Sequence, residues 1–221
     1  MNRLAARAVL PALGLVGIMS LAACSTAEPG REDNPDHTRP VRITVSPNST
    51  EQLILGEVYS QVLEETGRST SLSIGDSPGE VGPLERLRAG ETDLVIGCTG
   101  FFLHTLDPNR AEELSTAIET GEVEDPSDET YRAFMGALPS QMTSPDPSSA
   151  QGCAAEIRDG QAPELPQSVI PVYDRGIFDR EELEEVTAVT RFLTTDEIAG
   201  LVEATGEGSS VSGAVAEWLG Y

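Results

Sequence analysis

The segment 41–100 constrains the fold more than any other part of the chain, because short apolar runs alternate there with helical patterns. The runs 41–45, 71–74 and 92–96 have the composition of strands, with many β-branched residues in the first. Between the first two runs, residues 51–66 repeat apolar side chains at helical spacing, and a shorter helical pattern lies between the last two. This order is a βαβαβ unit, which predicts an α/β fold with a parallel sheet.

The turn before the first helical pattern is the first candidate for a ligand site. Ser49 and Gln52 have the spacing of a capping box, so we expect the helix to begin there. Ligands of open parallel sheets bind beyond the carboxyl ends of the strands. Three polar or glycine-rich loops are predicted at that edge: 46–50, 75–79 and 97–100.

These residues also resemble a known family. The runs 49–59 (STEQLILGEVY) and 84–94 (LERLRAGETDL) look like the first lobe of the quaternary-amine solute-binding proteins, the ABC-transporter receptors for glycine betaine, choline and carnitine. Thr99 and Gly100 are similar to the end of that family's third strand. The resemblance implies a periplasmic-binding-protein-like (type II) fold, with residues 41–100 and 167–221 as the first lobe.

Residues 101–166 take the place of the family's second lobe, which is a full α/β domain that supplies half of the binding cleft. Helical patterns at 108–120 and 127–138 are followed by a proline-containing loop at 140–150 and a possible short strand at 152–157. Most of the other strands and helices of a full second lobe have no counterpart in this segment. We therefore expect a reduced second lobe.

The last third of the chain resembles the family's return into the first lobe. Residues 168–172 form a strand candidate, and Asp179 is placed to cap a helix that ends near Phe192. Two further helices are expected at 197–204 and 212–219. Trp218, the only tryptophan, is best explained by packing of the last helix.

The N-terminus has the features of a lipoprotein leader. Arg3 and Arg7 precede an apolar stretch, and Leu21-Ala22-Ala23 stands directly before Cys24. We predict a signal peptide over 1–23, a lipid on Cys24, a flexible tether over 24–40, and a location on the extracytoplasmic face of the cell membrane. The alternatives are an ordinary secretory signal with an incidental Cys24, or a membrane helix, for which the apolar run is short.

Charge and cysteine content narrow the possible partners. The formal net charge is −23, which makes nucleic acid or an anionic membrane surface an improbable partner. Besides Cys24 the chain has two cysteines, Cys98 and Cys153, and export would permit them to form a disulfide. The alternative is a pair of free buried thiols.

No catalytic constellation is visible in the sequence. A P-loop, a dinucleotide fingerprint, a nucleophile elbow and a metal motif are all missing. His104 is the one histidine outside the predicted tether, so a nucleophile would have a single histidine as its base. We expect neither enzyme activity nor a cofactor or metal.

A quaternary ammonium ligand would need aromatic faces, because it has no N–H to donate. Its carboxylate, where present, would suit the N-terminus of the first helix. The family's cage tyrosine is replaced here by Cys98, and aromatic residues are 5% of the chain, which leaves Tyr173 as the best cage candidate. The candidate ligand-binding residues are Ser46, Asn48, Ser49, Thr50, Ser77, Thr99 and Tyr173.

Two functional hypotheses follow. The first is an extracytoplasmic solute-binding lipoprotein that delivers a quaternary amine or similar solute to an ABC permease. The second is a degenerate family member without solute binding, which acts as a cell-surface interaction or structural lipoprotein.

Overall fold

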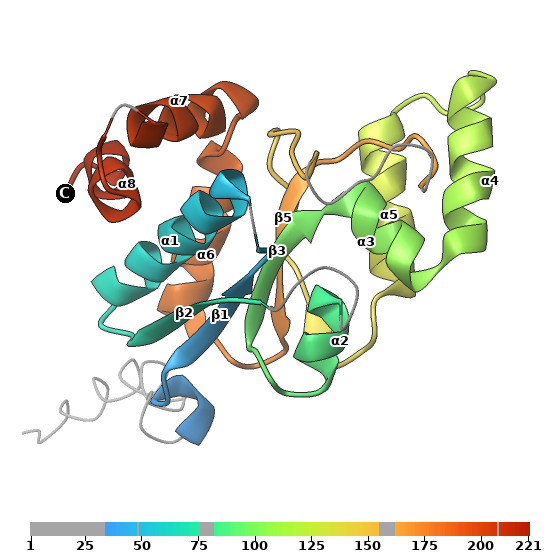
Figure 1. Cartoon of the computed structure of the whole chain (residues 1–221). Helices are drawn as coiled ribbons and strands as arrows, with labels where there is room; N and C mark the ends of the chain where they lie inside the picture. Colours follow the sequence, from blue (N-terminus) through green and yellow to red (C-terminus); the bar gives the residue numbers. More distant parts are fainter. Residues whose placement is uncertain (1–33, 48, 76–81, 155–161, 207) are drawn as a thin grey trace, which may run out of the picture.

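The computed structural model describes residues 34–47, 49–75, 82–154, 162–206 and 208–221 (Figure 1). The predicted signal peptide, Cys24, Asn48 and Ser77 therefore lie outside the described residues. None of the described helices is both long and apolar enough to span a bilayer.

A mixed sheet forms the centre of the molecule. Its strands are β1 (Val41–Val45), β2 (Thr70–Ile74), β3 (Leu94–Cys98), β4 (Met142–Thr143) and β5 (Val169–Asp174), in the spatial order β2-β1-β3-β5-β4. β1 pairs in parallel with β2 and β3, as the sequence predicts.

β5 runs antiparallel to β3 and β4, which was not predicted. The reason lies in the path of the chain. It leaves the sheet at Thr99 and returns at Ser168, and the Thr99 amide donates to the Ser168 carbonyl over 3.0 Å. Since the chain re-enters at the edge where it left, the returning strand must run in the opposite direction.

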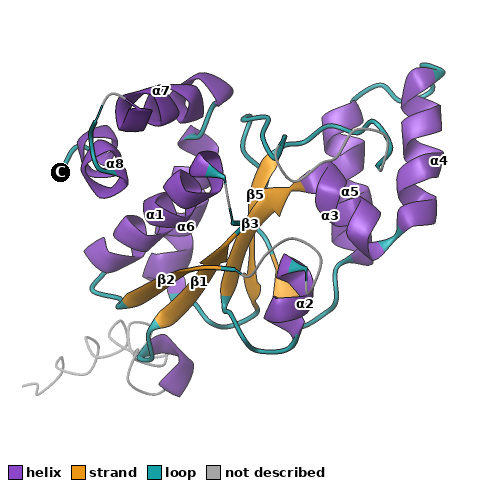
Figure 2. Cartoon of the chain, in the orientation of Figure 1, coloured by secondary structure: helices purple, strands orange, loops and turns teal. Residues whose placement is uncertain are grey.

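Helices cover both faces of the sheet (Figure 2). One face packs against α1 (Thr50–Glu65) and α6 (Arg180–Phe192), and α7 (Thr195–Gly206) and α8 (Val211–Leu219) pack in turn on α1. The other packs against α2 (Pro83–Arg88) and α3 (Thr99–Leu106), and α4 (Pro108–Glu119) and α5 (Pro126–Ala137) pack in turn on α3.

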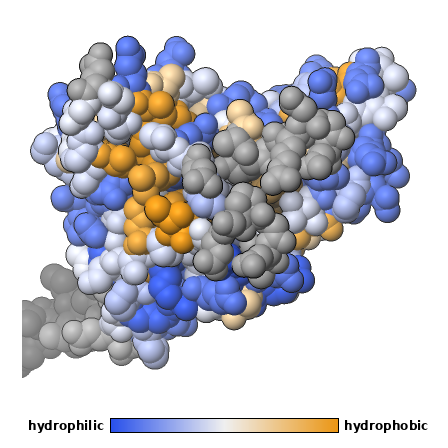
Figure 3. All heavy atoms as spheres, viewed as in Figure 1, coloured by the Kyte–Doolittle hydropathy of each residue, from blue (hydrophilic) through white to orange (hydrophobic). Residues whose placement is uncertain are grey.

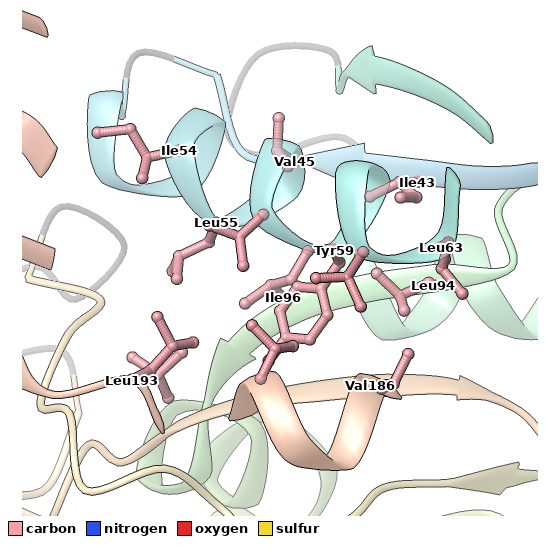
Figure 4. Close-up of a cluster of buried hydrophobic side chains, with 14 of the residues drawn as sticks. Ile43, Val45, Ile54, Leu55, Tyr59, Leu63, Leu94, Ile96, Val186 and Leu193 are labelled. Carbon is pink, nitrogen blue, oxygen red and sulfur yellow. The ribbon is translucent and has the colours of Figure 1, made fainter. Parts of the chain in front are cut away.

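Alternation along the strands explains this two-sided core. In β3, Leu94 and Ile96 face the α1 side, whereas Val95 faces the α2 side. Side chains of α1 such as Leu55 and Tyr59 point toward Ile96 and toward α6 (Figure 4). A strand buried on both faces is mostly apolar, as β3 is.

The segment 101–166 differs from its prediction in detail. α3 begins directly after β3, where no helix was expected, and β4 lies in the predicted 140–150 loop. The described residues 152–154 form no strand, although Gln151 makes a single β-bridge to Ser168. The buried side chains of α3, α4 and α5 join those of β3 and β5 in one hydrophobic cluster, in which Phe102 of α3 lies against Gly97 of β3 and the other two helices pack on α3.

The last part of the predicted flexible tether is folded onto the domain, which corrects that prediction for residues 34–40. A short 3₁₀-helix, η2 (Pro35–His37), is followed by Arg39, whose guanidinium makes two hydrogen bonds to Asp93, at 2.8 and 2.9 Å. Arg42 donates to the same carboxylate.

Hydrophobic surface gathers between α7 and α1 and over β2, whereas the surface around α4 is mostly hydrophilic (Figure 3). Ile74, on the outer strand β2, is 62% exposed.

Candidate functional site

The first turn of α1 and the carboxyl end of β3 lie together at one edge of the sheet. β1 and β3 are parallel, so Val45 and Cys98 end their strands at the same edge. Ser49 caps α1, and its hydroxyl accepts a hydrogen bond from the backbone amide of Gln52 over 3.2 Å. Ser46, half-buried, lies in the connection between β1 and α1. The helix thus begins where the sequence predicts.

The predicted disulfide between Cys98 and Cys153 is present, and it ties a third segment to this edge. Both cysteines are fully buried, and Cys153 has a φ of 63°, in the left-handed region that non-glycine residues seldom adopt. Glu51 of α1 accepts a hydrogen bond from the Cys153 amide over 2.9 Å. The bridge and this bond together hold the loop around Gly152 against both α1 and β3.

Gln52 is the most informative residue of the site. Its side chain is buried, with 1% exposure, yet neither its amide nitrogen nor its amide oxygen has a hydrogen-bond partner in the described part of the chain. Leaving such a group unpaired costs about 1–3 kcal/mol. Native proteins keep few such groups, and each needs an explanation.

The position of Gln52 on its helix shows where the amide lies. Gly56 is one turn further along the same face of α1, and a Cβ there would come within 2.5 Å of the side chain of Val45, the last residue of β1. Gln52, one turn nearer the helix N-terminus, therefore lies beyond the end of β1. This is the edge of the sheet at which α/β proteins bind ligands.

Our sequence prediction gave Gln52 a different role. A complete capping box needs the Gln52 side chain to reach back to the Ser49 backbone amide. The structure forms the Ser49 half of that arrangement and leaves the Gln52 side chain unpaired. The signal that could have found Gln52 is its place in the apolar row formed with Gly56 and Tyr59, where a polar residue is out of pattern.

The backbone adds donors beside this amide. The first amides of a helix have no intrahelical acceptor. The Ser49 hydroxyl accepts from the backbone amide of Gln52. The backbone amides of Thr50 and Glu51 form no hydrogen bond to described residues. With the positive end of the helix dipole, these N–H groups favour an anionic or acceptor group, while the Gln52 side chain can both donate and accept.

Thr99 lies at the same edge, but its polar groups already form hydrogen bonds within the protein. It is fully buried, its amide donates to Ser168, and its hydroxyl donates to the Pro166 carbonyl over 3.1 Å. The next two amides, of Gly100 and Phe101, bond to Pro166 and Gln167. The N-terminus of α3 therefore anchors the returning chain and has no amide to spare for a ligand.

Tyr173 is at the opposite edge, which corrects its grouping with the strand-end residues. In the antiparallel pair of β3 and β5, Tyr173 lies opposite Leu94, the first residue of β3, whereas Thr99 follows the last. Thr99 is five positions beyond Leu94, which corresponds to a distance on the order of 17 Å along an extended strand. The antiparallel direction of β5, which the sequence did not reveal, is the reason.

The described residues contain no group of three or more His, Cys, Asp or Glu side chains arranged to hold a metal ion.

Comparisons with known proteins agree with this architecture. No family model and no curated protein matches the chain. Solved structures do match, among them apo YehZ from Escherichia coli, with a TM-score of 0.57 and 13% sequence identity, over 82% of this chain and 98% of that chain. The chain has a periplasmic-binding-protein-like α/β fold. At this identity the likeness concerns the fold alone.

Proposed function

We propose that this protein is the solute-binding lipoprotein of an ABC importer, anchored through Cys24 on the extracytoplasmic face of the membrane. Its solute is a carboxylate-bearing quaternary amine such as glycine betaine or carnitine. The carboxylate binds at the first turn of α1, where Gln52 and the amides of Thr50 and Glu51 provide the donors. The loaded protein then delivers the solute to a membrane permease.

The unpaired side-chain amide of Gln52 is the observation that carries this proposal. A buried amide without a partner destabilises the free protein, so its retention is explained if a ligand completes its hydrogen bonds. The sequence resemblance of residues 49–59 and 84–94 to the quaternary-amine receptors supports the ligand class. The periplasmic-binding-protein-like fold supports the role in transport.

The residues of the site are better suited to bind the carboxylate of the solute than its ammonium group. Cys98 stands where the family has a cage tyrosine, and Tyr173 lies at the other edge of the sheet. The aromatic residue closest in sequence to Thr99 is the half-buried Phe101. We therefore expect glycine betaine and carnitine to bind more tightly than choline, which has the same cationic head but no carboxylate.

Isothermal titration calorimetry of the mature protein with these three solutes tests the proposal. Gln52→Met should weaken binding of glycine betaine by about tenfold or more, since it removes a hydrogen bond to a charged group worth about 1.5–3 kcal/mol. Gln61→Met is the matched control, because Gln61 lies on the same helix and bonds to Glu57 and Ser212. Equal affinities for wild type and Gln52→Met would contradict the proposal.

One observation favours the second hypothesis, a degenerate member that binds no solute. Thr99 and the first amides of α3 are fully occupied by the returning chain, and Tyr59 of α1 is fully buried with its hydroxyl bonded to Thr190. On that hypothesis none of the three solutes gives heat or a thermal shift. The protein would then act as a cell-surface interaction lipoprotein.

A further inference from the structure

A separate pocket lies at the β4 edge of the sheet. It is open to solvent, has a volume of about 540 Å³ and is lined entirely by residues outside the α1 site. Small-molecule sites occupy about 300–1,000 Å³, so its size suits a compact organic ligand. Its position beside Tyr173, opposite the start of β3, separates it from the proposed solute site beyond the end of β3.

The floor of this pocket is aromatic. Tyr173 and Phe178 are 3% and 8% exposed, and their ring centroids are 4.8 Å apart at an interplanar angle of 57°. Tyr131 of α5 adds a third, half-buried ring. Burial raises the pKa of Tyr173 to about 12, so its phenol stays protonated near neutral pH.

The walls come from a helix and from the segment after β4. Leu183, Thr187 and Arg191 follow one another at four-residue spacing along a single face of α6. On the other side, Ser144 and Asp146 come from the chain that leaves β4. The pocket thus has an aromatic floor with charged groups near its rim.

The charged groups of the pocket are not equally available. Arg175 is committed to the backbone, because its guanidinium donates to the carbonyls of Ser140 and Met142 over 3.1 and 3.3 Å. Arg191 pairs with Asp146 at 3.6 Å, and both side chains are mostly exposed, at 64% and 67%. Exposed pairs of this kind contribute about 0–1 kcal/mol, so a ligand can replace Arg191 on Asp146.

Asp146 is also tied to the aromatic part of the pocket. Burial and the neighbouring Asp146 carboxylate both raise the pKa of Tyr131, in that order of importance. Because Asp146 and Tyr131 both line the pocket, a cationic group paired with Asp146 can also contact the ring of Tyr131, where cation–π attraction adds to the charge pairing. The net charge of −23 also favours the approach of cations to this surface.

We propose that this pocket is a second binding site, specific for a small organic cation with an aromatic or apolar body. The ammonium group of the ligand pairs with Asp146 beside Tyr131, and its body packs on Tyr173 and Phe178. An anion is the less suitable occupant, because Arg175 already serves the backbone and Arg191 already faces a carboxylate.

The test uses benzylammonium as the cationic probe and benzoate and benzyl alcohol as its anionic and neutral counterparts. Binding is measured by ligand-observed NMR on the Gln52→Met protein, so that the result does not depend on the α1 site. We expect saturable binding of benzylammonium alone. Asp146→Asn and Tyr131→Leu should each weaken it about three- to fivefold, by loss of the charge pair or of the ring face.

Glu113→Gln is the matched control, because Glu113 is another exposed carboxylate paired with an arginine, Arg110, at 3.7 Å, and lies on α4, which contributes no residue to the pocket lining. Its affinity should stay within about twofold of the parent, since distant surface charges are screened by salt. Circular dichroism checks that each variant is folded. Absence of saturable benzylammonium binding, tighter binding of benzoate, or an unchanged affinity in Asp146→Asn would overturn the proposal.

Discussion

At the scale of single residues, the role proposed for Gln52 in ligand binding implies that its side chain destabilises the free protein. Its unpaired, buried amide lowers the stability of the free protein, so Gln52→Met, which has a similar volume and no polar atoms, should raise the free energy of unfolding by about 1 kcal/mol. Urea denaturation without ligand measures this. A destabilised Gln52→Met protein would mean that the amide is satisfied in solution, and the argument for a ligand would fail.

Gly97 is a second residue with a specific requirement. A Cβ at this position would come within 2.2 Å of the Phe102 ring, which packs across β3. Gly97→Ala should therefore destabilise the protein by about 1–3 kcal/mol through overpacking. Gly136→Ala in α5 is the control, because its Cβ meets no atom within 4 Å and should stabilise that helix by up to about 1 kcal/mol. Thermal denaturation should move the two midpoints in opposite directions, and equal shifts would contradict this account of Gly97.

At the scale of elements, Asp93 joins the N-terminal segment to the start of β3. Burial by itself would raise its pKa, but hydrogen bonds from Arg42 and Arg39 outweigh burial and hold the pKa of Asp93 well below its ordinary value. A carboxylate with a lowered pKa stabilises the fold above its unfolded pKa of about 3.9. This stabilisation is lost as the pH falls below that value toward the folded pKa.

Asp93→Asn therefore should be less stable than wild type at pH 7, with a difference that shrinks progressively below about pH 4. Denaturation midpoints measured from pH 7 to pH 2 test this, with the exposed Asp128→Asn as reference. A stability difference that stays constant across this range would show that Asp93 does not act through its charge.

The elements also show what the sequence could predict. β1, α1 and β2 followed from local periodicity and from the Ser49 cap, since each pattern depends on neighbours within a few residues. The direction of β5 depends on where the chain re-enters the sheet, which no local pattern records. α3 was missed because the apolar run 101–106 is expected of any buried segment, whether helical or extended.

The same difference between local patterns and tertiary packing explains which residues of the candidate site could be predicted. The Ser49 cap of α1 was predicted correctly, because cap residues are recognisable in sequence, whereas ligand binding by Ser49 and Thr50 stays a prediction. Gln52 was missed because the identical spacing fits a capping box, and only packing reveals that its side chain has no partner. Tyr173 was misplaced together with the direction of its strand.

At the scale of the whole molecule, the disulfide joins the sheet to the segment that crosses its edge. Cys98 and Cys153 are separated by 55 residues, and closing a loop of this length stabilises a protein by about 4 kcal/mol on the chain-entropy model. Replacing both cysteines by alanine should therefore lower the free energy of unfolding by about this amount. Guanidinium denaturation measures it, with iodoacetamide labelling of the wild type as a check. A loss below about 1 kcal/mol, or ready labelling of both thiols, would contradict the bridge.

The central claim for the molecule is that its solute completes the hydrogen bonds of the Gln52 side chain at the first turn of α1. The most direct measurement is a titration of the ¹⁵N-labelled mature protein with glycine betaine, in which the side-chain NH₂ signals of Gln52 are identified by their absence in Gln52→Met. We predict a saturable shift of these signals, with the Gln61 side-chain signals unchanged. Gln52 signals that do not move while the solute binds elsewhere, or that do not move at any solute concentration, would contradict the claim.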